Sequence, residues 1–148
     1  MFDIESKSQD EIILTTKKTT IKINIAESII DANLQVGKIA GPGEFEIGDA
    51  TIRGIATPSG KTIYDVEIGG VHVGITGGIE ECLDDIVADI LCTSSIRAIR
   101  EIEPKLVVSM GNVDAMVSEL KLSARSEKKL KIKSLDSLPT TKEVVVLS

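Results

Sequence analysis

Apolar and polar residues alternate along most of the first half of the chain. The clearest case is the segment 19–26, in which Ile21, Ile23 and Ile25 alternate with Lys22 and Asn24. A period of two is typical of a β-strand with one face in water. The same period, or a short apolar run, predicts further strands at residues 11–16, 36–40, 45–47, 50–57, 62–68 and 71–76.

Turn residues separate these predicted strands. Lys17-Lys18 suits a tight turn between the first two strands. Gly69-Gly70 is typical of a two-residue hairpin, because glycine accepts the positive φ angles of the primed turns. Further turns are predicted at residues 41–43, 48–49 and 58–60. We therefore expect residues 1–78 to form an antiparallel meander.

The hydrophobic period changes after Gly77-Gly78. Residues 79–83 predict a short helical turn and residues 86–92 a buried strand. Ser94 is a suitable N-cap for a helix that ends before Pro104, and a second helix is predicted over residues 113–121. Strands are predicted at 105–110, 130–134 and 141–147. The strand–helix–strand order indicates a parallel or mixed sheet on which helices pack, so we expect one α+β domain over residues 1–148.

Composition supports a folded domain with an unusual core. The chain has 148 residues, of which 42% are hydrophobic and 27% charged. A chain of this length buries enough surface to fold without disulfides or structural metals. Its aromatic residues are Phe2, Phe45 and Tyr64 alone, so the core is expected to be aliphatic.

Charge and cysteine content narrow the range of partners. A formal net charge of −6 gives no general attraction for nucleic acid, and three aromatic residues offer few surfaces for base stacking. No apolar run is long enough to span a membrane, and the first residues lack the basic and apolar regions of a signal peptide. Two cysteines are too few for a disulfide framework. We expect a soluble cytoplasmic protein with no nucleic-acid or membrane partner.

Five segments occur in a distinctive order: GPGEFEI at 41–47, TIRGIAT at 51–57, TIYDVEIGGV at 62–71, IEPKLVVSM at 102–110, and the tail at 131–147. This order resembles the metallo-β-lactamase-fold hydrolases, in particular the branch that includes the ascorbate-6-phosphate lactonases. Residues 1–25 are similar to the opening strands of that family. The resemblance implies an αββα sandwich, here β-rich and with a reduced helical layer on the first half.

The metal ligands of that family are missing from this chain. Its members hold one or two metal ions with a His-x-His-x-Asp-His cluster, a later histidine, an aspartate and a final histidine. The cluster is absent here, and too few residues lie between Ile25 and Gly41 for the loop and helix that carry it. The aspartate falls on Gly78 and the final histidine on Gly111. The resemblance therefore implies a dismantled site with no catalytic residue, metal or cofactor.

The remaining reactive side chains have structural explanations. His72 lies between Val71 and Val73, so a surface or partly covered strand histidine is expected; alone it forms neither a triad nor a metal site. Cys82 and Cys92 lack zinc and redox spacing and are expected to be buried, unreactive thiols.

Three clusters of charged residues or glycines are explained in the same way. Carboxylates without calcium-loop spacing indicate a solvated turn: Glu80, Glu81, Asp84, Asp85 and Asp89. Glycines without phosphate-loop spacing indicate hairpin turns and close packing: Gly69, Gly70, Gly74, Gly77 and Gly78. A basic stretch indicates a solvated helix face, a loop and an outer strand face: Lys121, Arg125, Lys128, Lys129, Lys131 and Lys133.

These observations favour a non-catalytic protein of the metallo-β-lactamase fold that acts through binding or self-assembly. Two alternatives stay open. One is a metal-dependent hydrolase with a carboxylate site at Glu44, Glu46 or the acidic cluster of residues 80–89. The other is a small-ligand sensor. Because missing helices would leave apolar sheet surface exposed, we also expect a homo-oligomer, namely a two-fold dimer.

Overall fold

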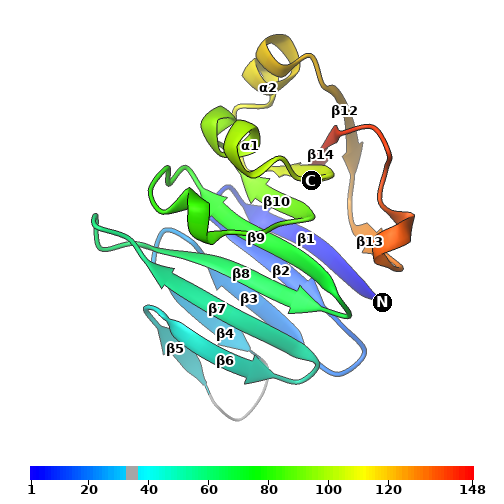
Figure 1. The fold of residues 1–148 in the computed structure, drawn as a ribbon. Coiled ribbons are helices and arrows are strands. Elements are labelled where there is room, and N and C mark those ends of the chain that lie inside the picture. The colour runs from blue at the N-terminus through cyan, green and yellow to red at the C-terminus, as the bar shows by residue number, and fades with distance from the viewer. Residues whose placement is uncertain (33–36) are drawn as a thin grey trace.

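Two β-sheets lie face to face in the computed structural model of the protein, which describes residues 1–32 and 37–148 (Figure 1). Within these ranges the smaller sheet has six strands, in the order β13 (Leu130–Ile132), β1 (Phe2–Ser8), β2 (Glu11–Thr15), β3 (Thr20–Asn24), β4 (Ile29–Ala32) and β5 (Lys38–Ala40). Each neighbouring pair in it is antiparallel. The predicted tight turn at Lys17-Lys18 is confirmed between β2 and β3.

The larger sheet is mixed. Its eight described strands follow the order β12 (Ser123–Glu127), β14 (Glu143–Leu147), β11 (Leu106–Ser109), β10 (Ile90–Thr93), β9 (Val71–Gly77), β8 (Thr62–Ile68), β7 (Ala50–Ala56) and β6 (Gly43–Ile47). Strands β6 to β9 are antiparallel, and the pairs from β9 to β12 are parallel. The Gly69-Gly70 hairpin is confirmed, with φ of 57° and 81°. The predicted meander therefore exists, but it is divided between two sheets.

The core lies between the sheets and is aliphatic, as predicted. Ile4 and Leu14 of the smaller sheet and Val66 and Val73 of the larger one are fully buried in the same cluster. Tyr64, the one fully buried aromatic residue among those described, points into this core from β8. Its hydroxyl has no hydrogen-bond partner among the described residues, and burial raises the pKa of the phenol to about 12.

Both α-helices pack on the outer face of the larger sheet. Helix α1 (Ile96–Ile102) contacts β10, and α2 (Val113–Leu120) contacts β14 and β12. They lie at one end of the sheet and leave the outer face of β6, β7 and β8 without a described α-helix (Figure 1). Two short 3-10 helices, η1 (Leu83–Asp85) and η2 (Leu135–Ser137), complete the described helices. None of the described helices is long and apolar enough to cross a membrane.

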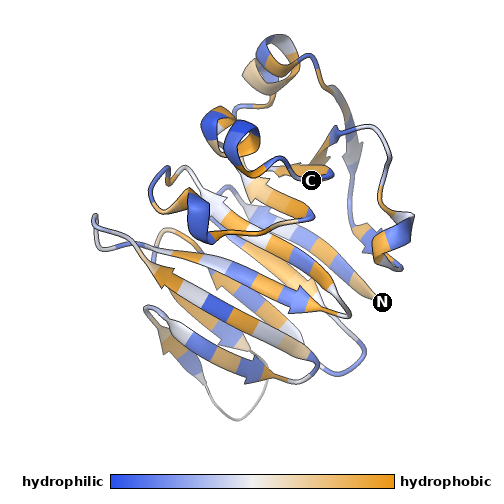
Figure 2. Cartoon of the chain, in the orientation of Figure 1, coloured by the Kyte–Doolittle hydropathy of each residue, from blue (hydrophilic) through white to orange (hydrophobic). Residues whose placement is uncertain are grey.

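The outer face of the smaller sheet is predominantly polar. Its outward positions include Asp3, Glu5, Lys22 and Asp31, none of which is buried. No described α-helix packs there, so the described residues show helices on one sheet and not the full αββα arrangement. Hydrophobic and hydrophilic residues alternate along the strands of both sheets (Figure 2). The described part of this face therefore lacks the apolar surface from which a dimer was expected, and the dimer itself stays a prediction.

Three local predictions in the second half are displaced. The helix N-cap is Ser95 and not Ser94, because the Ser95 hydroxyl accepts a hydrogen bond from the Ala98 N–H at 3.0 Å. The strand predicted over 86–92 begins only at Ile90, because residues 86–88 pack on the outer face of β9. The helical turn predicted at 79–83 is found at Leu83–Asp85.

Strand β12 was not predicted at all. Its sequence, SARSE, has no apolar face, and all but its last residue are exposed, so the hydrophobic pattern carries no strand signal there. The basic stretch was expected to include a helix face, whereas it contains this edge strand and β13. Residue 36, at the start of another predicted strand, lies outside the described residues.

Candidate functional site

Strands β9, β10 and β11 run parallel and end at one edge of the larger sheet. Hydroxyl groups link these ends: Thr93 Oγ1 donates to the Gly77 carbonyl at 2.9 Å and accepts from Thr76 Oγ1 at 2.8 Å. The Ser94 N–H also donates to Gly77 O at 2.9 Å. Because carboxyl ends of parallel strands commonly carry ligand-binding residues, this edge is the first candidate site.

Gly78 and Gly111 lie on either side of Ser94 at this edge. A methyl group on Gly78 would lie 3.3 Å from Ser94 Oγ, and one on Gly111 would lie 3.7 Å from Ser94 Cβ. The two positions to which the family resemblance assigns metal ligands are therefore neighbours in space. Neither has a side chain with which to bind an ion.

Ile25 occupies the space next to these positions. It follows β3, is 5% exposed, and belongs to the central core. A methyl group on Gly77 would lie 2.9 Å from Ile25 Cγ2, and Gly77 has a φ of +56°. The hydroxyl of Ser28 accepts a hydrogen bond from the Thr62 N–H at 3.1 Å, which ties the β3–β4 loop to β8. Hydrocarbon, not donor atoms, fills this part of the edge.

The carboxylates proposed for an alternative metal site are spread apart. Glu80 accepts a hydrogen bond from the Ser95 hydroxyl, and Glu81 accepts one from the Ser59 N–H at 3.3 Å. Asp89 Oδ2 accepts from a backbone N–H of β9 at 2.9 Å. Across residues 1–32 and 37–148, no three His, Cys, Asp or Glu side chains converge so that they could hold a metal ion. The described donor set therefore does not fit a hydrolytic metal centre.

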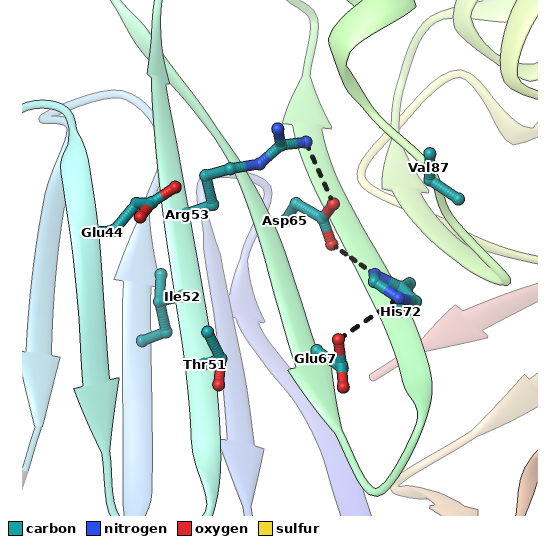
Figure 3. Close-up of a pocket in the computed structure, with 8 residues that line it drawn as sticks. All are labelled: Glu44, Thr51, Ile52, Arg53, Asp65, Glu67, His72 and Val87. Atoms are coloured by element: carbon teal, nitrogen blue, oxygen red, sulfur yellow. Dashed lines mark hydrogen bonds and ion pairs between the residues drawn. The ribbon is translucent and has the colours of Figure 1, made fainter.

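A second candidate site lies on the outer face of β6 to β9. Here a pocket of about 380 Å³ is lined by Glu44, Thr51, Ile52, Arg53, Asp65, Glu67, His72 and Val87 (Figure 3). The strand register builds it from two rows of side chains. Glu44, Arg53 and Asp65 are cross-strand neighbours in one row, and Thr51, Glu67 and His72 are neighbours in the next.

Four of these side chains form a continuous charged chain (Figure 3). Arg53 Nη2 lies 3.4 Å from Asp65 Oδ2, and Asp65 Oδ1 lies 3.1 Å from His72 Nδ1. On the other side of the ring, His72 Nε2 lies 3.4 Å from Glu67 Oε2. The Asp65 side chain is 8% exposed, so its charge is removed from water; Arg53 compensates this charge, and His72 Nδ1 lies within hydrogen-bond distance.

The prediction for His72 is confirmed in one respect and wrong in another. The ring is partly covered, with 33% of the side chain exposed, as expected for a strand histidine. It is not alone, because Asp65 and Glu67 contact its two nitrogens. The two-residue turn at Gly69-Gly70 was the available signal, since it pairs Glu67 directly with His72. The pairing of Arg53 with Asp65 depends on a longer loop and had no comparable signal.

The two cysteines differ from each other. Cys92 is fully buried, as predicted, and burial raises the pKa of its thiol. Cys82 is only half-buried, which corrects the prediction; its Sγ lies 3.7 Å from the Ala56 carbonyl. It sits in the solvated turn before η1 and not in the core, because the helical turn begins later than predicted.

The glycine cluster matches its structural explanation, and the basic cluster is solvated as expected although it lies on strands and loops and not on a helix face. Gly74 allows close packing, since a methyl group there would lie 2.9 Å from Ile86 Cγ2. The basic side chains are exposed, and two of them form ion pairs: Arg125 with Glu127 and Glu143, and Lys129 with Asp3 at 3.8 Å. Neither cluster forms a candidate site.

Comparison with solved structures identifies the fold. A crystal structure from Thermotoga maritima, described as a proposed Zn-dependent hydrolase of the metallo-beta-lactamase superfamily, matches with a TM-score of 0.71 and 17% sequence identity. The match covers 99% of this chain and 98% of that one. No protein-family model matches the chain and no curated protein matches its sequence. The chain thus has a metallo-beta-lactamase fold.

Proposed function

We propose that this chain is a binding protein on a metallo-beta-lactamase fold and that it carries out no metal-dependent hydrolysis. One observation carries the proposal: the two positions that the resemblance assigns to metal ligands are glycines, which lie on either side of Ser94. A hydrolytic zinc ion needs about three protein ligands and an open position for water. Gly78 and Gly111 supply none of these ligands, and Ile25 fills adjacent space.

The pocket over β6 to β9 supports a function in binding. It is concave, combines charged side chains with the apolar surface of Val87, and lies on a sheet face that no α-helix covers. Small-ligand sites commonly combine apolar walls with a few placed polar groups. The polar outer face of the smaller sheet gives less support to self-assembly. We also propose a likeness to the ascorbate-6-phosphate lactonase branch. A cytoplasmic location is part of the same proposal and is supported by the two free thiols.

Metal analysis tests the proposal directly. The full chain would be produced in medium supplemented with zinc and manganese, dialysed without chelator, and measured by mass spectrometry of the metals. We expect far less than one metal ion per chain and no saturable heat on titration with Zn²⁺. One tightly held metal ion per chain, together with metal-dependent turnover of an ester or phosphodiester, would falsify the proposal.

A metal-dependent hydrolase is the second candidate, because the structural neighbour is described as a proposed Zn-dependent hydrolase. In this chain such an activity would need ligands other than positions 78 and 111. Replacing Glu80 or Asp89 by alanine separates the two candidates. If these carboxylates only brace loops, the substitutions alter stability and leave metal content unchanged.

A further inference from the structure

The wall of the outer pocket is held in place by specific contacts. The Asp89 N–H donates to the His72 carbonyl at 2.9 Å, and the His72 N–H donates to Asp89 Oδ2 at 2.9 Å. Gly74 lets the segment approach, because a methyl group there would lie 2.9 Å from Ile86 Cγ2. Val87, 64% exposed, extends this wall beside the pocket. The concave shape is therefore built into the fold.

The same wall also contacts Arg53, the positively charged side chain of the pocket. Arg53 Nη2 donates to the Asp85 carbonyl and lies 3.4 Å from the Asp65 carboxylate. The guanidinium thus already has an anionic partner and a carbonyl acceptor within the protein. An anionic ligand would have to compete with the buried Asp65 for it.

The two exposed carboxylates of the pocket have fewer partners within the protein than Arg53 has. Glu67 contacts His72 at 3.4 Å, and 49% of its side chain is exposed. Glu44 is exposed, and no hydrogen bond or ion pair joins it to any described residue. Glu44 and Glu67 lie on β6 and β8, with β7 between them and an offset of two residues along the strands, so their backbones are about 12 Å apart. The pocket therefore offers two carboxylates, on opposite sides, to a ligand.

We propose that this pocket binds a small organic cation, with one or two primary ammonium groups on a short aliphatic stem. Glu44 and Glu67 accept charge-assisted hydrogen bonds from the ammonium groups, and Val87 contacts the stem. The side chain of Thr51, in the same row as Glu67, provides a further acceptor. The inference rests on the proposed function, because it gives the ligand class for a binding protein.

Calorimetric titration of the full chain with 1,4-diaminobutane tests the ligand class. Butane-1,4-diol serves as the neutral ligand of similar length and butanedioate as the anionic one, at matched ionic strength. We expect saturable heat with the diamine alone. The Glu44→Gln and Glu67→Gln variants should each weaken its binding about three- to tenfold, because each loses one exposed charge-assisted contact.

Glu119→Gln is the matched control. Glu119 is exposed on α2 and carries the same charge as Glu44, but it does not line the pocket. The affinity of this variant for the diamine should stay within about twofold of the unmodified chain, since only long-range screened charge is lost. Equal weakening by Glu44→Gln and Glu119→Gln would show non-specific attraction and would overturn the inference.

The remaining outcomes separate this inference from the proposed function. No saturable heat with the diamine overturns the cation inference alone. Saturable binding of butanedioate in its place, weakened by Arg53→Gln, also overturns the cation class but supports a function in binding. A retained stoichiometric metal overturns the proposed function, whatever the diamine titration gives.

Discussion

The carboxyl edge of β9 to β11 and the outer face of β6 to β9 belong to one sheet but present different side chains. At the edge, Gly78 and Gly111 lie on either side of Ser94 without side-chain ligand atoms, and Ile25 fills the space beside Gly77. On the outer face, Arg53, Asp65 and other charged side chains line a pocket. An apolar side chain packs in the first region, whereas charged side chains line an open pocket in the second.

This difference shows why a fold does not define an activity. Function depends on the donor atoms that a site presents, and such atoms can be absent from one region of a sheet and present in another. Strand β9 connects the two regions, since His72 near its start lies in the pocket and Gly77 at its end lies at the edge. Substitutions in each region should therefore have separate and predictable effects.

The largest effect is expected from Gly77→Ala at the edge. The new methyl group would meet Ile25 Cγ2 at 2.9 Å and would force a non-glycine residue to a φ of +56°. We expect the free energy of unfolding to fall by about 2–4 kcal/mol, measured by urea denaturation. The control is Gly78→Ala, for which the nearest atom is Ser94 Oγ at 3.3 Å and the expected loss is below about 1 kcal/mol. Similar losses in both variants would show that Ile25 does not close the edge.

Strand β8 allows a second test, on the core side opposite the pocket. The pKa of Tyr64 is about 12 in the folded chain, against 10.0 ordinarily, because the phenol is buried. As the pH rises above 10, the unfolded chain releases this proton first. Stability is therefore unaffected below about pH 10 and falls by up to about 2.7 kcal/mol as the pH approaches 12.

Tyr64→Phe isolates this contribution. The variant should lose less stability than the unmodified chain between pH 10 and 12 in urea denaturation. At pH 7 its stability should be unchanged or slightly higher, because no described residue hydrogen-bonds to the Tyr64 hydroxyl. A large loss of stability at pH 7 would contradict this account.

Asp65→Asn tests the charged chain of the pocket. Loss of the carboxylate leaves Arg53 and His72 without their buried partner. We expect a loss of about 1–2 kcal/mol by urea denaturation, less than for a fully buried pair because both partners are partly in water. Glu67→Gln, at a half-exposed position in the same chain of contacts, should lose no more than about 0.5 kcal/mol. Equal losses of stability in the two variants would contradict the view that burial makes Asp65 contribute more to stability than Glu67.

The smallest effect concerns the helix that begins at the edge. Ser95→Ala removes the N-cap of α1 and the contact with Glu80, and should lower thermal stability by the equivalent of about 1 kcal/mol. The matched variant Ser94→Ala keeps the cap and should be close to neutral. A larger loss of thermal stability in Ser94→Ala than in Ser95→Ala would contradict this account and would favour Ser94 as the N-cap, as the sequence pattern predicted.

Sequence patterns predicted most strands because their side chains alternate between the core and water. Residues 62–68 match β8 without error, since turn residues bound them on both sides. The same method missed β12, whose polar residues pair at a sheet edge and have no buried face to mark them. It also placed a strand over residues 86–89, because an apolar run does not reveal which surface it covers.

For the sites, the sequence alone determined what is missing. Glycine at positions 78 and 111 excludes side-chain ligand atoms there in any conformation, because the limit lies in the covalent structure of the residue. Tertiary structure alone decided that these positions lie on either side of Ser94, and that Arg53, Asp65, Glu67 and His72 line one pocket. Such convergence depends on strand register and on close packing between segments distant in the chain, which a linear pattern does not specify.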